Sequence, residues 1–255
     1  MSTLRPTERF SDRVENYKKF RPGYPAGVIT SLQDLFPADR RPLRIADVGA
    51  GTGIFTRLLL EAGHEVWAVE PNDEMRFVAE KDLASYPSFH ALKGSSERMG
   101  LPAAEFDLVT AAQAFHWFDP RATRREFRRL LKPDGRAAIL WNNRQVLSPV
   151  EIAYENFLTD TSKEYAQVRA QTKKAIVNLQ TFFTEGSLRH QSFENHQDFD
   201  WESFWGRYLS SSYAAKPGSP QAQDALGLLR AIFQRYSEND LVRIHYVTDL
   251  YTGRC

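Results

Sequence analysis

The sequence has very little cysteine: one residue, Cys255, in a chain of 255. One thiol excludes an intrachain disulfide and a multi-cysteine metal site. Charge of one sign is also lacking, since 33 Lys and Arg oppose 32 Asp and Glu for a net charge of +1. Such a balance gives no general attraction to phosphate backbones or anionic lipid. We therefore expect no nucleic-acid partner and no membrane partner.

Long hydrophobic runs are absent too. No stretch approaches the ~18 apolar residues that a membrane-spanning helix requires. The first ten residues are polar and lack the apolar core of a signal peptide, so we expect a cytoplasmic protein. Hydrophobic residues make up 42% and charged residues 25%, as in ordinary globular proteins. The length is compatible with a single α/β domain over 1–255.

Between residues 43 and 143, short apolar segments alternate with amphipathic ones. This pattern predicts a mostly parallel, doubly wound sheet with helices on both faces. The expected strands are 43–48, 64–70, 88–92, 106–112 and 136–141, and the expected helices are 54–62, 73–83 and 120–131.

The flanking parts follow other patterns. Two helices are expected in residues 1–42, over 8–20 and from Pro25, because the prolines and glycine of 21–25 break helical geometry. The alternation in 241–251 suits a half-exposed antiparallel edge strand. Residues 144–255 are expected to form a helical cover and the last two strands of a seven-stranded sheet. The expected segments there are helices 149–160, 166–177, 201–209 and 221–237 and strands 188–194 and 241–251.

A glycine-rich turn, 47–53, follows the first expected strand. Gly49, Gly51 and Gly53 carry no side chain, so the backbone can approach a ligand at the carboxyl end of the sheet. The spacing is not G-x-G-x-x-G, because the third glycine comes one residue early. Glu70 ends the second strand, where a carboxylate can accept both hydroxyls of a ribose. The alternatives are a tight turn without a ligand and a carboxylate that only caps the next helix.

Four segments together resemble a known family. Residues 47–53, 69–72, 93–102 and 106–118 are similar, in the family's order, to the motifs of class I S-adenosylmethionine (SAM)-dependent methyltransferases. Tyr17 and the segments 21–25, 141–144 and 251–254 resemble a small-molecule branch that includes trans-aconitate methyltransferase-like proteins. The resemblance implies a Rossmann-like methyltransferase fold with an antiparallel last strand, and SAM as the cofactor. Ser95 departs from the pattern, because many relatives have Asp there to bind the adenine amino group.

The resemblance also implies roles for single residues. Asp47 would face the methionine end of SAM, Glu70 would bind the ribose, and Gln113 would lie near the sulfonium. Arg21 would pair with the cofactor carboxylate, the alternative being a solvated charge at a helix end. The cofactor residues so implied are Tyr17, Arg21, Asp47, Gly49, Ala50, Gly51, Gly53, Glu70, Pro71, Asn72, Met75, Ser96, Glu97 and Gln113.

The acceptor side is expected to hold Trp117, Trp141, Asn142 and Trp205, although core packing is the alternative for Trp205. His116 is the candidate catalytic base, since an unperturbed imidazole has a pKa of about 6.5. Its alternative is a shape and hydrogen-bonding role beside the cofactor. A carboxylate acceptor needs no base, because it is ionised near neutral pH.

The expected activity is therefore methyl transfer from SAM to a small organic acceptor, with O-methylation of a carboxylic acid as the finer hypothesis. Two other interpretations stay open: a nicotinamide-dependent oxidoreductase, and a SAM-binding protein without turnover. No metal is expected, because His190 and His196 lack a ligand pattern around them. The arginines of 120–131 are expected to form a solvated face: Arg121, Arg124, Arg125, Arg128 and Arg129.

Overall fold

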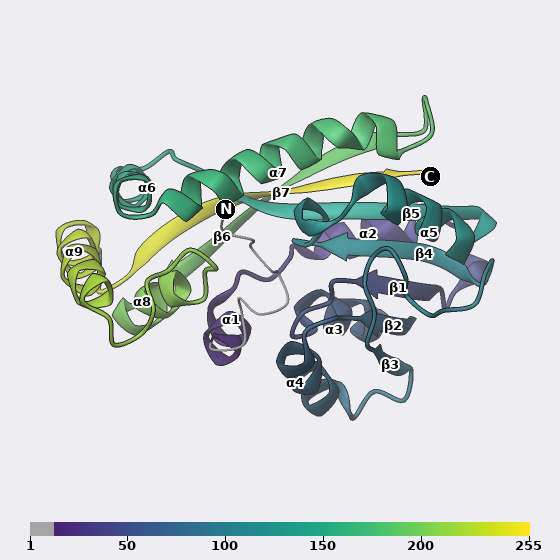
Figure 1. The fold of residues 1–255 in the computed structure, drawn as a ribbon, viewed down its shortest axis with the longest axis horizontal. Coiled ribbons are helices and arrows are strands. Elements are labelled where there is room, and N and C mark those ends of the chain that lie inside the picture. Colours follow the sequence, from purple (N-terminus) through teal and green to yellow (C-terminus); the bar gives the residue numbers. More distant parts are fainter. Residues whose placement is uncertain (1–12) are drawn as a thin grey trace.

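The computed structural model describes residues 13–255 as a seven-stranded sheet with helices on both faces (Figure 1). The strand order is β3-β2-β1-β4-β5-β7-β6. The first five strands pair in parallel, and β7 runs antiparallel to both of its neighbours. The predicted fold class is thereby confirmed. The strands are β1 Arg44–Val48, β2 Glu65–Val69, β3 Phe89–Leu92, β4 Phe106–Ala112, β5 Leu131–Arg144, β6 Arg189–Phe199 and β7 Val242–Gly253.

The helices follow the predicted order with some changes in length. The helix expected over 8–20 begins at Val14 within the described residues, and 8–12 lie outside them. The helix expected over 166–177 is longer at both ends, because Ser162 caps its first turn by accepting a hydrogen bond from the Tyr165 amide. The helices are α1 Val14–Phe20, α2 Ala26–Gln33, α3 Ile54–Glu61, α4 Asp73–Leu83, α5 Pro120–Leu130, α6 Pro149–Thr161, α7 Lys163–Phe182, α8 Trp201–Leu209 and α9 Pro220–Tyr236, with short 3-10 turns η2 Ala38–Arg40 and η3 Phe115–Trp117.

The prediction that the last strand lies at the sheet edge is wrong. β7 lies between β5 and β6, and β6 forms the edge. The alternation in β7 has another cause: Val242, Ile244 and Tyr246 pack into a cluster with α6, α8 and α9, while their neighbours are more exposed. The β6 sequence is mostly polar and exposed, which suits an edge strand because it discourages pairing with other chains.

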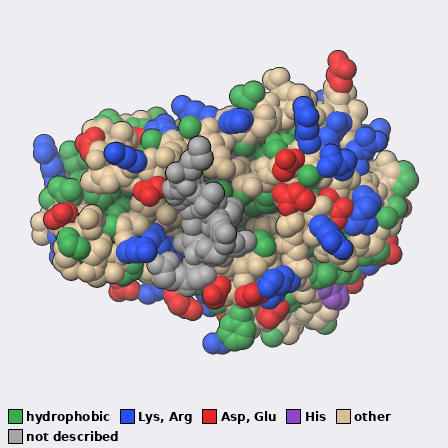
Figure 2. All heavy atoms as spheres, in the orientation of Figure 1, with side chains coloured by type: hydrophobic (Ala, Val, Ile, Leu, Met, Phe, Trp, Pro, Cys, Tyr) green, Lys and Arg blue, Asp and Glu red, His purple; other side chains and the backbone are tan. Residues whose placement is uncertain are grey.

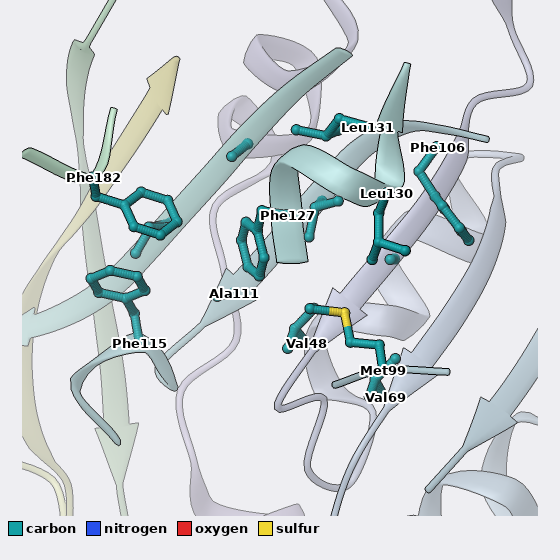
Figure 3. Packing of buried hydrophobic residues seen from close by; sticks show 14 of the residues in the cluster. Val48, Val69, Met99, Phe106, Ala111, Phe115, Phe127, Leu130, Leu131 and Phe182 are labelled. Carbon is teal, nitrogen blue, oxygen red and sulfur yellow. The ribbon is translucent and has the colours of Figure 1, made fainter. Parts of the chain in front are cut away.

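Successive residues of the central strands face opposite layers of core. Val48 packs against α5 and α7, whereas Ile45 packs against α2 and α3. Figure 3 shows the first layer, in which Phe115 and Phe182 lie close to Phe127. Each buried aromatic ring of this kind contributes roughly 1.5–3 kcal/mol. This packing fixes η3, and with it the loop after β4, at the carboxyl end of the sheet.

A third cluster joins α6, α8 and α9 to β6 and β7 at one end of the molecule (Figure 1). Helix α1 lies against α8, and the Phe20 ring covers Gly206 so closely that a Cβ there would lie 2.1 Å from it. Helix α1 is therefore held to the helical cover, and hydrogen bonds from Asn142 and Asn195 to the Gly23 carbonyl tie the segment after it to β5 and β6. Figure 2 shows Lys and Arg interspersed with Asp and Glu on the face drawn. Within residues 13–255, no helix is long and apolar enough to cross a membrane.

Candidate functional site

The glycine turn after β1 forms the floor of the site. Gly51 has a φ of +59°, and a Cβ built there would lie no closer than 3.8 Å to another group, the Met75 sulfur. Gly53 has a φ of +82°, but its Cβ would lie 2.8 Å from Leu83 of α4. Gly51 thus leaves room for a ligand, whereas Gly53 allows two helices to pack closely. The cofactor role predicted for Gly53 is therefore indirect.

Asp47 is buried under this turn, with a side chain held by two hydroxyl groups. Thr56 donates a hydrogen bond to one carboxylate oxygen at 2.6 Å, and Thr110 donates to the other at 2.8 Å. Burial raises the pKa of Asp47 to about 6, although both hydrogen bonds favour the ionised form. The carboxylate is thus fixed in place and only weakly stabilised as an anion.

Glu70 is held in a similar way at the end of β2. Its two oxygens accept hydrogen bonds from the Gly51 amide at 2.9 Å and the Asn72 amide at 2.8 Å. Asn72 in turn caps α4 by accepting a hydrogen bond from the Met75 amide. Burial raises the pKa of Glu70. Because a carboxylate offers about four acceptor positions, two stay available for hydroxyl groups of a ligand.

Three cavities adjoin at this edge of the sheet. The first has a volume of about 250 Å³, the second about 50 Å³ and the third about 390 Å³. Tyr17 and Gln113 line all three, so the cavities meet at these two residues. Gln113 has a φ of +57°, which is unfavourable for a residue with a side chain and is typical of functional sites.

Most of the predicted residues line one or more of these cavities. The first cavity is lined by Tyr17, Gly49, Gly51, Glu70, Pro71, Asn72, Met75, Ser96, Glu97, Gln113 and Trp117. The second is lined by Arg21, Asp47, Gly49, Ala50 and Asn142, with Tyr24 and Arg207. The third is lined by Tyr17, Arg21, Gln113, His116, Trp117, Trp141 and Asn142.

Trp205 lies outside all three cavities. Its ring stacks with Trp201 and contacts Tyr208 within the helical cover. The structure thus favours core packing for Trp205. Asn142 lines two cavities, but its amide already donates to the Gly23 carbonyl and accepts from Thr248. Its contacts join β5 to the N-terminal segment and to β7.

His116 lines the third cavity as a half-buried, neutral imidazole. Its Nδ1 accepts a hydrogen bond from the Trp141 indole at 3.3 Å, which leaves the ring proton on Nε2. Removal from water, together with the positive charge of Arg21, lowers the pKa of His116 to about 3. The imidazole is therefore a weak proton acceptor, and its Nε2 proton is available for a hydrogen bond. This geometry favours the hydrogen-bonding role over that of a catalytic base.

The third cavity is strongly cationic. Within residues 13–255, its charged lining groups are one carboxylate, Glu155, and five cations: Arg21, Arg144, Arg169, Lys173 and Arg207. The sequence patterns predict a role for Arg21 alone among them. The others come from β5, α7 and α8, which are distant in the chain and share no local motif. Within residues 13–255, no three His, Cys, Asp or Glu side chains form a group that could hold a metal ion.

Comparison with known proteins finds similarity in the central part of the chain. Residues 46–139 match the family model described as a methyltransferase domain. An uncharacterized methyltransferase of Mycobacterium bovis is 41% identical over 135 residues, 53% of this chain and 52% of that protein. A methyltransferase-like protein of Schizosaccharomyces pombe is 36% identical over 55% of this chain and 54% of its own length. The chain thus spans about half the length of the curated relatives it matches.

Solved structures agree with the fold over nearly the whole chain. A structure from Anaeromyxobacter dehalogenans, assigned as a type II methyltransferase, has a TM-score of 0.68 at 22% identity and covers 92% of this chain and 98% of its own. A phosphoethanolamine N-methyltransferase of Haemonchus contortus with S-adenosylhomocysteine has a TM-score of 0.54 at 15% identity, covering 97% of this chain and 58% of its own. Residues 46–139 thus match a methyltransferase domain, and the described residues share the fold of these methyltransferase structures.

Proposed function

We propose that the whole chain is a SAM-dependent methyltransferase that methylates an oxygen of a small organic acid. One observation carries the proposal: the cofactor cavities open, at Tyr17 and Gln113, into a cavity lined by five cations and one carboxylate. A volume of about 390 Å³ is at the lower end of the range of small-molecule sites. The acceptor hypothesis thus rests on size and charge together.

The residues around the first two cavities fit the parts of SAM. Glu70 offers free acceptor positions for ribose hydroxyls, and Gly51 leaves the floor of the first cavity open. In the second cavity Asp47 would face the amino group of the methionine part, and Arg21 its carboxylate. The expected sulfonium position is then the junction at Tyr17 and Gln113. Tyr17 and Arg21 belong to the segments that resemble the trans-aconitate methyltransferase-like branch, which supports that finer hypothesis.

SAM supplies a methyl group on a positively charged sulfur, and transfer joins that methyl to an acceptor oxygen while the electron pair of the carbon–sulfur bond stays on sulfur. A carboxylate acceptor is already ionised, so the protein needs to orient it and exclude water but need not remove a proton. The neutral, hydrogen-bonded His116 suits this chemistry. A relative from Halalkalibacterium halodurans, 36% identical over 38% of each chain, is named a malonyl-[acyl-carrier protein] O-methyltransferase, which also supports an oxygen acceptor.

The first test is calorimetric titration with S-adenosylhomocysteine, the product of any methyl transfer from SAM. We expect micromolar binding to the wild type and none to Gly51→Arg, whose side chain would fill the first cavity. The control is Gly63→Arg, at a surface turn of the same φ class, which should bind normally. Absence of binding to folded wild type, together with tight NADH binding, would favour the oxidoreductase instead.

The second test measures turnover with methyl-labelled SAM. Each acid in a panel of small mono- and dicarboxylic acids is compared with its primary amide, which has a similar shape but no charge. We expect label in base-labile methyl esters of one or more acids and none in the amides. Binding of S-adenosylhomocysteine without transfer to any acid or amine would instead favour a SAM-binding protein without turnover.

A further inference from the structure

Two arginines near the junction of the cavities lack a carboxylate partner. Arg21 follows α1 and donates to the Ser210 carbonyl at 3.0 Å, with its guanidinium over the Tyr17 ring. Arg207 of α8 donates to the hydroxyls of Ser210 and Ser211. The Nε atoms of both arginines are buried and have no hydrogen-bond partner. Within the described residues, the charged and phenolic groups that act most strongly on them are arginines and tyrosines.

The other cations of the third cavity differ in this respect. Arg144 pairs with Glu155 and also donates to the Tyr165 hydroxyl at 2.8 Å. Arg169 pairs with the other oxygen of the same Glu155 carboxylate. The single acid of the cavity is therefore already used by these two arginines. Its charge cannot also compensate Arg21 and Arg207.

Burying a charge without a partner is unfavourable, and two like charges side by side add repulsion. The pKa of Arg21 is lowered by burial and by the charge of Arg207, whereas the surrounding tyrosines raise the pKa of Arg207 despite its burial. A site built in this way is complementary to two anions. SAM, the cofactor of the proposed function, carries one carboxylate, which can pair with one of the two arginines. The other arginine remains to bind an anionic group of a second molecule.

The neighbours of each arginine indicate which anion it binds. Arg21 adjoins Pro22 and Tyr24, which line the second cavity but not the third. Tyr213 and Tyr246, which line the third cavity but not the second, act on both arginines, but only Arg207 forms a side-chain hydrogen bond with Tyr246. Arg207 thus lies on the acceptor side of the junction, and Arg21 on the cofactor side.

We propose that Arg207 binds the carboxylate of the methyl acceptor and thereby determines specificity for organic acids. This inference rests on the proposed function and names the residue through which the acid is recognised. A planar guanidinium can hold one carboxylate oxygen while the other stays free to receive the methyl group. The body of the acid would lie against the apolar walls of the third cavity, Trp117, Trp141, Val168 and Ile176.

The test uses the full chain saturated with S-adenosylhomocysteine, so that the cofactor cavities are filled. Benzoate, hexanoate and succinate are titrated as probes, with benzamide as the uncharged counterpart of benzoate. For Arg207→Met we expect at least a tenfold loss of affinity for the acid that binds wild type best, with benzamide unchanged. Arg207 also lines the second cavity, so affinity for S-adenosylhomocysteine should change too, but by a smaller factor than affinity for the acid. Arg21→Met should instead weaken S-adenosylhomocysteine at least tenfold.

Arg230→Met, on the exposed face of α9, is the matched control and should leave both affinities unchanged. The circular dichroism spectrum and the melting temperature of Arg207→Met are compared with those of wild type, which checks its folding. Two outcomes overturn the inference: none of the three acids binds the saturated wild type, or Arg207→Met binds them normally. Failure of S-adenosylhomocysteine to bind wild type would refute the proposed function itself, which makes the two failures distinguishable.

Discussion

Replacing Asp47 by Asn should stabilise the protein near neutral pH while weakening its cofactor site. Asp47 is 1% exposed, and burial raises its pKa from 3.8 to about 6. The folded state therefore prefers the protonated carboxyl. Asn has nearly the same shape, and its amide can still accept from one of the two threonine hydroxyls and donate to the other.

The sign of the effect follows from the raised pKa. Below pH 3.8 the carboxyl is protonated in the folded and unfolded states, and its burial carries no charge penalty. Between pH 3.8 and about 6 the carboxyl ionises in the unfolded state but stays protonated in the folded one, so the folded state loses stability over this range, and the loss is complete above about pH 6. A shift of about two units corresponds to at most about 3 kcal/mol. Asn cannot ionise, so Asp47→Asn should exceed wild type by up to about that amount at pH 7.5 and by much less at pH 4.5.

Urea denaturation of both proteins at pH 4.5 and pH 7.5 measures this difference. Titration with S-adenosylhomocysteine at pH 7.5 should show at least a tenfold loss of affinity in the variant, because the amino group of the ligand loses its charged partner. Thr56→Val is the matched control: it removes a hydrogen bond to the ionised form, so it should destabilise more at pH 7.5 than at pH 4.5. An Asp47→Asn stability difference that is equal at the two pH values would refute the reasoning.

Three other substitutions test single contacts. His116→Gln should keep turnover within about threefold and leave the dependence of turnover on pH unchanged from pH 6 to 9, because the pKa of the imidazole lies far below that range. A variant whose turnover no longer depends on pH as that of wild type does would reveal His116 as a catalytic base. Glu70→Gln should lower the affinity for S-adenosylhomocysteine about tenfold in calorimetry, because one acceptor oxygen is replaced by an NH₂ donor that faces a backbone amide. Unchanged affinity would mean that Glu70 does not bind the ribose. Gly206→Ala should lower the free energy of unfolding by about 1–3 kcal/mol, because its Cβ overlaps the Phe20 ring. Gly227→Ala, where the added carbon meets nothing, should instead raise it by up to about 1 kcal/mol.

The sequence by itself determined the central sheet and the cofactor edge. Periods of two and 3.6 residues are local properties, so they identified β1, α3, β2 and α4 with small errors at the ends. The glycine turn and Glu70 belong to one strand–helix–strand unit, and Val48 pairs with Val69 in the register of β1 and β2. Residues that directly follow two neighbouring parallel strands lie together at the carboxyl end of those strands. For this reason local sequence patterns are enough to name the residues of the first cavity.

The tertiary structure alone decided the acceptor side and the state of its ionisable groups. Arg21, Arg144 and Arg207 come from three elements separated by more than 60 residues each, and no local pattern predicts that they line one cavity. The sequence could not place β7 in the sheet, because a strand buried on one face alternates apolar and polar residues whether it lies at the edge or inside the sheet. Its place was decided by its pairing with β5. The pKa values of Asp47 and His116 depend on burial by distant parts of the chain. Local periodicity fixes which elements form, but charge balance and protonation are set by long-range packing, which removes water from groups that the sequence keeps far apart.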